Sequence, residues 1–143
     1  SDSLDYELLR MMRRAGCEMI SLGIETASDR LNVLIRKNET VEQHRQAVAL
    51  IKRAKIGVRG SFIIGLPTET REEAEDTVRF VVQHGETGSG SIHSAGQSIF
   101  TLEKDSAVYH HPEKFKIDRV IHHPDRDMAV IFDYDISVGM GRE

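Results

Sequence analysis

The chain has 143 residues and a mass of 16.1 kDa, and its 39% hydrophobic and 29% charged residues are not the composition of a disordered or fibrous protein. The formal net charge is −4, with basic residues dispersed among acidic ones, so the sequence has no electrostatic footprint for nucleic acid. The apolar runs are too short to cross a membrane and the first residues have no signal-peptide pattern, so we expect a cytoplasmic protein.

Alternating helix and strand signals occupy the first two thirds of the chain. Apolar residues at helical spacing predict a helix over residues 4–15, which Gly16 ends. The short apolar-rich run 18–25 predicts a buried strand, and the apolar residues of 31–35 predict a short helix. These signals are typical of an α/β protein.

Two capping boxes then mark helix starts. In the first, Thr40 and Gln43 open a helix that runs to about Lys55. Residues 56–65 predict the next strand, and the second box, Thr70 with Glu73, opens another helix. The expected inner face of that helix consists of small or apolar residues: Ala74, Thr77, Val78, Val81 and Val82.

This order implies parallel strands joined by helical crossovers, with cover expected on both faces of the sheet. Two or three such strands do not complete a barrel or a doubly wound sheet, and the sequence begins abruptly inside a helix. We therefore expect a fragment of a larger fold.

The signals weaken in the last third. Residues 85–96 are small and polar and predict a long loop within one domain, with a linker as the alternative, followed by a strand over 97–102. Residues 129–132 predict one more strand, which ends at Asp133–Asp135. A solvated strand end is the expected reading of those two aspartates, with a carboxylate site as the alternative.

Two His-His-Pro pairs, at His110–His111 and His122–His123, have ligand types compatible with zinc or iron, together with Asp125 and Asp127. Adjacent residues of an extended chain point in opposite directions, so each pair offers one ligand easily. The prolines that follow favour exposed turns, and we expect no metal site here.

Three phrases, taken in order, carry a family resemblance. They are Ser-Leu-Gly-Ile-Glu-Thr-Ala-Ser-Asp at 21–29, Leu-Ile-Arg-Lys-Asn-Glu-Thr-Val-Glu at 34–42, and Gly-Val-Arg-Gly-Ser-Phe-Ile-Ile-Gly-Leu-Pro-Thr-Glu-Thr at 57–70. The series resembles the second half of the radical SAM core, in the branch of the cobalamin-binding enzymes and the Elongator catalytic subunit. The resemblance covers residues 3–83, with a weaker echo at 97–109.

The resemblance implies an α/β fold: an incomplete parallel (β/α) half-barrel, the second half of a radical SAM partial TIM barrel, with an irregular C-terminal extension. Residues 1–109 would be the C-terminal part of a (β/α)6 core, and residues 110–143 the extension. The family's "T-P-x-P-G-T-x-x-Y" phrase is altered here, because Thr101–Tyr109 lacks the Pro-Gly pair.

The family binds S-adenosylmethionine (SAM) across the carboxyl ends of these strands. By resemblance, Glu25 contacts the ribose or the amino group of SAM, and Thr26 and Ser28 add hydroxyl contacts. Lys37 lies where relatives place a basic residue near the methionyl carboxylate, and the adjacent Arg36 is an alternative.

On the next strand, Ser61 occupies a position of polar ligand contact, and Gly65, Leu66 and Pro67 shape the turn that lets the backbone approach the adenine. Structural alternatives stay open for each residue. Glu25 could cap a helix or pair with Arg59, Lys37 could be a solvated charge, and the other residues could serve only the strand and its turn.

The implied function is that of a parent protein, meaning a longer protein of which this chain is a part. It would reductively cleave SAM with a [4Fe–4S] cluster to start methyl transfer, methylthiolation or rearrangement, with cobalamin as a further cofactor of the parent. The C-x3-C-x2-C cluster loop is absent, and the single cysteine, Cys17, is expected to be a small core residue that excludes an internal disulfide.

The cluster ligands and the partner half of the barrel would therefore lie outside this chain, which we expect to contain no catalytic residue and to be inactive alone. The alternative function is a non-catalytic α/β binding or interaction module derived from the same core. The substrate cannot be identified from the sequence.

Overall fold

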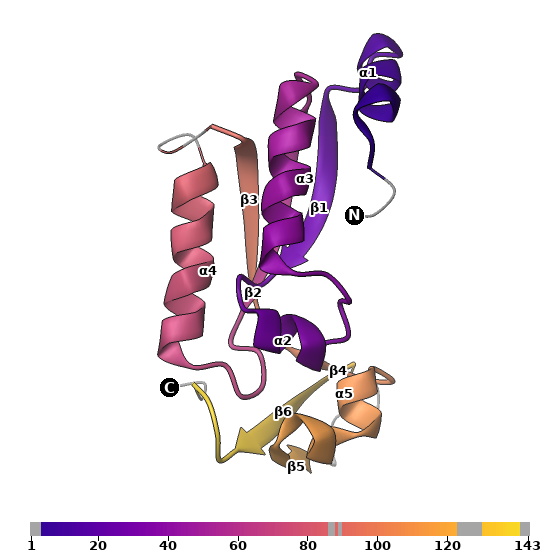
Figure 1. Ribbon diagram of the computed structural model, residues 1–143. Helices are drawn as coiled ribbons and strands as arrows, with labels where there is room; N and C mark the ends of the chain where they lie inside the picture. Colours follow the sequence, from indigo (N-terminus) through magenta and orange to yellow (C-terminus); the bar gives the residue numbers. More distant parts are fainter. Residues whose placement is uncertain (1–3, 86–87, 89, 123–129, 141–143) are drawn as a thin grey trace.

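The computed structural model describes residues 4–85, 88, 90–122 and 130–140. The N-terminal part alternates helices and strands along the chain (Figure 1). Its elements are α1 (Tyr6–Arg14), β1 (Met19–Glu25), α2 (Asp29–Leu34), α3 (Val41–Arg53), β2 (Gly57–Ile64), α4 (Arg71–His84) and β3 (Ile92–Ile99).

Local capping fixes where these helices begin. Asp5 caps α1 by accepting a hydrogen bond from the Leu8 amide at 2.7 Å. The two predicted capping boxes are confirmed, at Thr40 for α3 and at Thr70 for α4. Gly16, with φ of +95°, follows the end of α1 as predicted.

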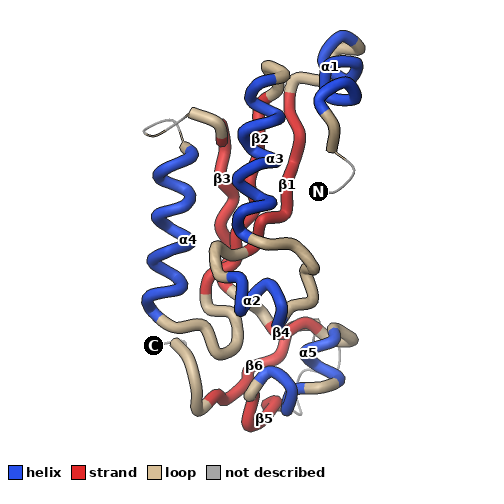
Figure 2. Tube along the Cα trace, in the orientation of Figure 1, coloured by secondary structure: helices blue, strands red, loops and turns tan. Residues whose placement is uncertain are grey.

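The strands form a parallel sheet in the order β1-β2-β3. Leu22 pairs with Gly60, and Gly60 pairs with Ala95. Both α3 and α4 lie on one side of this sheet (Figures 1 and 2). A parallel (β/α) arrangement, as predicted, therefore sets the architecture.

The hydrophobic core lies between the sheet and these helices. It is built from fully or almost fully buried side chains: Leu9, Ile24, Val48, Ile51, Ile56, Val58, Phe62, Phe80 and Ile92. Cys17 packs against this cluster, as expected of a small core residue.

The opposite sheet face was expected to be covered, and within the described residues no helix lies on it. Alternate residues of β2, Arg59 and Ser61, point to this face and are exposed, as are Ser21 on β1 and Ser94 on β3. We call this surface the open face. Its named side chains are three serines and one arginine, whereas the interior of a closed barrel is filled by bulky branched side chains.

Two boundaries differ from the sequence prediction. β3 begins at Ile92 rather than residue 97, so the second half of the expected loop is a strand paired with β2. In α4, Phe80 is buried instead of Val78 and Val82, which are about half exposed.

The extension over residues 110–143 was expected to be irregular, and this was wrong, because it contains the 3-10 helix η1 (Pro112–Phe115), β5 (Ile117–Ile121) and β6 (Ile131–Ile136). It is preceded by β4 (Leu102–Glu103) and α5 (Ala107–His110), and together these elements make up the C-terminal segment. Its strands form an antiparallel sheet in the order β4-β6-β5, which lies beyond the carboxyl ends of the parallel strands (Figure 1). The division of the chain at residue 109 stays a prediction.

The strand expected at 129–132 begins, in the described residues, at Ile131 and extends through Asp133–Asp135 to Ile136, so these aspartates lie within β6. Asp135 accepts two hydrogen bonds from Arg119, at 2.7 and 3.0 Å. It therefore belongs to a cross-strand ion pair.

The described histidines of the two pairs have protein neighbours, and the rings of His110 and His122 both lie beside that of Tyr109, with centroids at 5.6 and 6.2 Å. His110 ends α5 and lies 3.6 Å from Asp105, and the ring centroid of His122 lies 5.0 Å from that of Phe132. His123, Asp125 and Asp127 are outside the described residues. Where side chains are described, no three His, Cys, Asp or Glu residues gather closely enough to hold a metal ion.

Among the helices that the structure describes, none is long and apolar enough to cross a lipid bilayer.

Candidate functional site

Two loops carry the predicted site residues, and both follow parallel strands. β1 ends at Glu25 and β2 ends at Ile64, and their parallel pairing places both ends at the same edge of the sheet. We call this the carboxyl edge. Ligands of α/β folds bind at such edges, because the strand ends leave their loops free to vary.

A charged pair forms at this edge. Glu25 Oε1 lies 3.7 Å from Lys37 Nζ, and about a quarter of each side chain is exposed. This distance is longer than an ordinary N–H···O hydrogen bond, and among the described residues neither charged group makes a hydrogen bond, although Lys37 also attracts Glu39 electrostatically. Both groups therefore keep hydrogen-bonding capacity for a ligand.

Gly23 makes room for this pair. A Cβ atom at Gly23 would lie 2.5 Å from Glu25 Oε1 and 3.1 Å from Lys37 Nζ. Glu25 itself has φ of +66°, a left-handed conformation that is uncommon for residues other than glycine. The carboxylate of Glu25 and the ammonium of Lys37 thus meet in the space over Gly23, where any other residue would place a side chain.

The loop between α2 and α3 delivers Lys37 to this position. The Lys37 amide donates to the Asn32 carbonyl at 2.8 Å, and the flanking residues Arg36 and Asn38 both have left-handed backbones. Arg36 is exposed, and in the described structure it forms no ion pair with Glu25. Of the two basic residues weighed from the sequence, Lys37 is the one that faces the carboxylate.

Thr26 and Ser28 have protein partners for their hydroxyl groups. Thr26 is fully buried, and its Oγ1 lies 3.3 Å from Thr77 Oγ1. Ser28 caps α2 and donates from Oγ to Glu73 at 2.7 Å. These contacts tie the loop after β1 to α4, so direct ligand contact by these hydroxyls stays a prediction.

Ser61 projects from the open face between two glycines. In the sheet register it pairs with Gly23 on one side and with Gly96 on the other. Its hydroxyl is therefore the only side-chain polar group in that row of the three described strands. A ligand lying on the open face would meet Ser61 in the strand position next to the one over which Glu25 and Lys37 meet.

The second loop turns sharply after β2. Gly65 has φ of +82°, while Leu66 and Pro67 are buried. The Gly65 amide donates to Glu69 Oε2 at 2.5 Å, and the Glu69 amide donates to the Leu66 carbonyl at 2.9 Å. The carboxylate of Glu69 thus closes the turn predicted at this point.

Glu69 is a site-adjacent residue that the sequence analysis missed. Its side chain is fully buried, and Oε1 has no hydrogen-bond partner among the described residues. Burial raises the pKa of Glu69, against the smaller opposing effect of the Gly65 and Leu66 amides. The environment therefore favours the neutral acid more than water does.

A further network joins the two loops. Arg30 Nε and Nη2 donate to the two oxygens of Glu73 at 2.9 and 2.6 Å, and Nη1 and Nη2 donate to Thr68 Oγ1 and O at 2.9 and 2.8 Å. The hydrogen bonds from Arg30 lower the pKa of Glu73 to about 2. Only the Thr70–Glu73 capping box was visible in the sequence, since Arg30 is 43 residues away.

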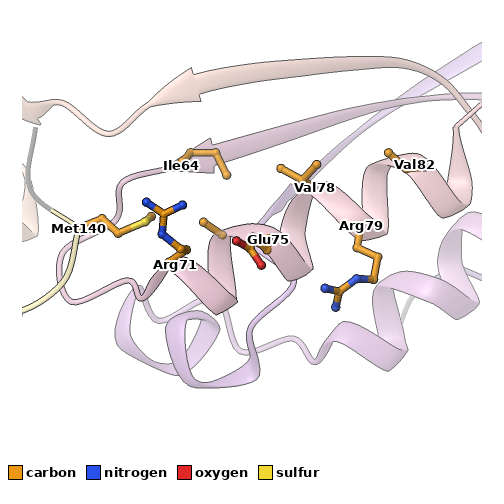
Figure 3. Close-up of a pocket in the computed structure, with 8 residues that line it drawn as sticks. Ile64, Arg71, Glu75, Val78, Arg79, Val82 and Met140 are labelled. Atoms are coloured by element: carbon orange, nitrogen blue, oxygen red, sulfur yellow. The ribbon is translucent and has the colours of Figure 1, made fainter. Parts of the chain in front are cut away.

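A groove of about 570 Å³ lies along α4. Figure 3 shows Val78 and Val82 of α4 with Ile64 and Met140 on its lining. None of the predicted site residues lines this groove. The groove adjoins the carboxyl edge at Ile64 and otherwise runs along α4.

Comparison with known families agrees with the three phrases at the carboxyl edge. Residues 1–81 match the family model described as the radical SAM superfamily. This segment includes α1 to β2 and most of α4, and hence both loops of the site.

Individual relatives match a similar share of the chain. An uncharacterized methyltransferase of Pyrococcus horikoshii is 39% identical over 79 residues, 55% of this chain and 17% of that protein. An anaerobic magnesium-protoporphyrin IX monomethyl ester cyclase of Cereibacter sphaeroides is 40% identical over 75 residues, 52% of this chain and 12% of that protein.

A tRNA-2-methylthio-N(6)-dimethylallyladenosine synthase of Buchnera aphidicola is 33% identical over 64 residues, 43% of this chain and 15% of that protein. The chain thus matches less than a fifth of the length of each of these three relatives.

Proposed function

The chain belongs to the radical SAM superfamily, and we propose that its carboxyl edge is half of a SAM site in a radical SAM enzyme. The proposal depends most on one observation, the Glu25–Lys37 pair held over Gly23. The methionyl end of SAM carries an ammonium and a carboxylate, and this pair offers one partner of opposite charge for each.

The residues at this edge fit the ligand in chemistry and in access. Glu25 accepts hydrogen bonds from an ammonium or from ribose hydroxyls, and Lys37 donates to a carboxylate. Ser61 adds one hydroxyl on the open face, in the strand position next to Gly23. The turn at Gly65–Pro67 supplies backbone carbonyl groups for the adenine end, because its amides at Gly65 and Leu66 are bonded to Glu69, and Thr26 and Ser28 hold the loop after β1.

The residues of this chain do not fit the iron–sulfur cluster. The family's cluster is held by three cysteine thiolates, whereas the sequence contains only Cys17. Cys17 is packed against the core on the helix side of the sheet. The cluster ligands in this proposal belong to another part of the parent protein.

When bound beside a reduced cluster, SAM supplies a 5′-deoxyadenosyl radical. The role proposed for this chain is to bind and orient the polar end of SAM. Methyl transfer, methylthiolation and ring-forming rearrangement are the reaction classes proposed for the parent protein, whose substrate these residues do not define.

The test is a titration of the isotopically labelled chain with SAM, followed by amide chemical shifts. We expect the largest shifts at Glu25, Lys37, Ser61 and Gly65, with none at Val78 and Val82 in the α4 groove. S-adenosylhomocysteine, which keeps the amino and carboxylate groups, should shift the same residues. Absence of shifts at the carboxyl edge, or shifts confined to the α4 groove, would contradict the proposal.

The runner-up function, a non-catalytic binding module of the same descent, needs a different measurement. Iron and sulfide analysis of the complete gene product separates the two functions. Bound iron and sulfide, with SAM cleavage on reduction, support the enzyme. SAM binding at the carboxyl edge without iron would support the module instead.

A further inference from the structure

Thr68 lies in the loop after β2 with φ of +68°, in the left-handed region. For a β-branched residue such a backbone is a genuine outlier and is strained. Residues in this state persist only where their surroundings hold them there. The contacts of Thr68 therefore show what fixes the shape of the loop.

Arg30 makes two of these contacts. It donates to the Thr68 hydroxyl at 2.9 Å and to the Thr68 carbonyl at 2.8 Å, so it holds both the side chain and the backbone. The guanidinium also donates to both oxygens of Glu73. Four of its five N–H groups are thus used in one planar arrangement, which lysine cannot reproduce.

Glu73 fixes the orientation of Arg30. Its carboxylate also accepts from Ser28 Oγ at 2.7 Å and from the Thr70 amide at 3.0 Å. Only 17% of the Glu73 side chain is exposed. The carboxylate therefore lies between the loop after β1, which contains Ser28, and the start of α4.

The far side of Thr68 is packed by the C-terminal segment. A Cβ atom at Gly139 would lie 2.8 Å from the Thr68 Cα, and the Met140 amide donates to the Glu69 carbonyl at 2.9 Å. The loop is thus held between the Arg30 guanidinium and the backbone of residues 139–140. Neither contact involves the Glu25–Lys37 pair.

We infer that Arg30 and Glu73 are positioning residues for the ligand: they hold Thr68 in its strained conformation and so keep the Gly65–Pro67 turn in register with Glu25. This inference rests on the proposed function. Arg30 and Glu73 act through Thr68 and not by contact with SAM.

The strained backbone of Thr68 provides the test. In Thr68→Gly this backbone is no longer strained, so Arg30 and Glu73 are not required to hold it. Glycine adopts positive φ freely, so the loop keeps its shape without help. In the otherwise unchanged chain, Arg30→Lys should weaken SAM binding about tenfold, the loss equivalent to about 1.4 kcal/mol. In the Thr68→Gly background, the same change should weaken it less than about threefold.

Arg119→Lys is the matched control, because Arg119 also donates two hydrogen bonds to a carboxylate, that of Asp135 in the other sheet, and has no contact with Thr68. It should leave SAM affinity unchanged. If Arg30→Lys does not fold, as judged by circular dichroism, Glu73→Gln takes its place in the same double-mutant cycle. Hydrogen exchange gives a readout without ligand: the Glu69 amide should exchange faster in Arg30→Lys than in Arg119→Lys.

Additive effects of Arg30→Lys and Thr68→Gly on affinity would overturn the inference, as would unchanged affinity and unchanged exchange in Arg30→Lys. In both cases wild-type binding at the carboxyl edge would leave the proposed function intact. No SAM binding by the wild-type chain would overturn the proposed function, and with it the positioning role of Arg30.

Discussion

Glu25 and Lys37 face each other at 3.7 Å across the carboxyl edge of the parallel sheet, and they come from different elements. Glu25 ends β1, whereas Lys37 lies in the loop between α2 and α3. Their pairing removes one structural alternative, in which Glu25 pairs with Arg59. It also shows how the structure presents two opposite charges, with little mutual hydrogen bonding, at one place.

Gly23→Ala should disturb this pair more than it disturbs the fold. The added Cβ would lie 2.5 Å from Glu25 Oε1, a separation that forces the flexible carboxylate to move. We expect SAM affinity to fall about tenfold and the free energy of unfolding to change by less than about 1 kcal/mol. Isothermal titration and urea unfolding measure the two quantities.

The control for that change is Gly96→Ala. Gly96 lies on β3 and, like Gly23 on β1, pairs with Ser61 of the central strand. A Cβ atom there would meet only the Gly60 carbonyl oxygen, at 3.9 Å. SAM affinity should stay at the wild-type value. Equal losses in both variants would mean that any methyl group on the open face interferes, and that the pair has no special role.

The Arg30–Glu73 contact should make the free energy of unfolding depend on pH in the acid range. The folded-state pKa of Glu73 is lowered from 4.5 to about 2. Ionised Glu73 therefore contributes its full stabilisation of the folded state above the unfolded-state pKa, and this stabilisation is lost as pH falls from about 4.5 towards 2. Glu73→Gln should lower the free energy of unfolding by about 1–3 kcal/mol at pH 7.

Urea unfolding of wild type and Glu73→Gln between pH 7 and pH 2 provides this measurement. The difference between the two proteins should shrink through the window from about pH 4.5 to pH 2. Asp135→Asn, in the exposed pair with Arg119, should show a smaller difference at pH 7 because exposed ion pairs contribute little. If the difference in free energy of unfolding between wild type and Glu73→Gln stayed constant from pH 4.5 to pH 2, the lowered pKa of Glu73 would be contradicted.

Glu69 should change the free energy of unfolding with pH in the direction opposite to Glu73. Its pKa is raised in the folded state, so its ionisation is penalised by folding. Stability is then highest below the unfolded-state pKa and falls as pH rises through the folded-state pKa. Glu69→Gln should be more stable than wild type at neutral pH and should lose this advantage below about pH 4, where the wild-type carboxyl is also neutral.

Thermal unfolding at pH 4 and pH 7 tests this expectation. In Glu69→Gln, the amide oxygen of the introduced side chain can accept from Gly65, and its NH2 group occupies the place of Oε1, which has no partner among the described residues. Wild type being more stable than Glu69→Gln at pH 7 would show that the ionised carboxylate is favoured in this turn.

Local signals in the sequence were sufficient for most of the parallel part. The capping boxes at Thr40 and Thr70 depend on residues three positions apart, so their chemistry can be recognised without the fold. The strand ending at Glu25 and the turn at Gly65 followed from the same kind of short pattern. Predicting Glu25 and Lys37 as site residues came from the family resemblance.

Non-local contacts explain what was missed. β3 is a run of small polar residues whose strand conformation comes from pairing with β2, and its own composition is typical of a loop. Arg30, Thr68 and Glu73 join loops that lie about 40 residues apart, and no spacing rule connects them. The antiparallel sheet of the last third depends likewise on pairing of short strands.

The most direct measurement of the central claim is the SAM affinity of Glu25→Asn, Lys37→Ala and the control Glu7→Ala by isothermal titration. Asparagine tolerates the left-handed backbone at position 25, and Glu7 forms an exposed pair with Arg10 away from the sheet edge. We predict a loss of about 10- to 100-fold for Glu25→Asn, a smaller loss for Lys37→Ala, whose charge Arg36 can partly replace, and none for Glu7→Ala. Wild-type affinity in Glu25→Asn would contradict the account, because the carboxylate would then serve the fold alone.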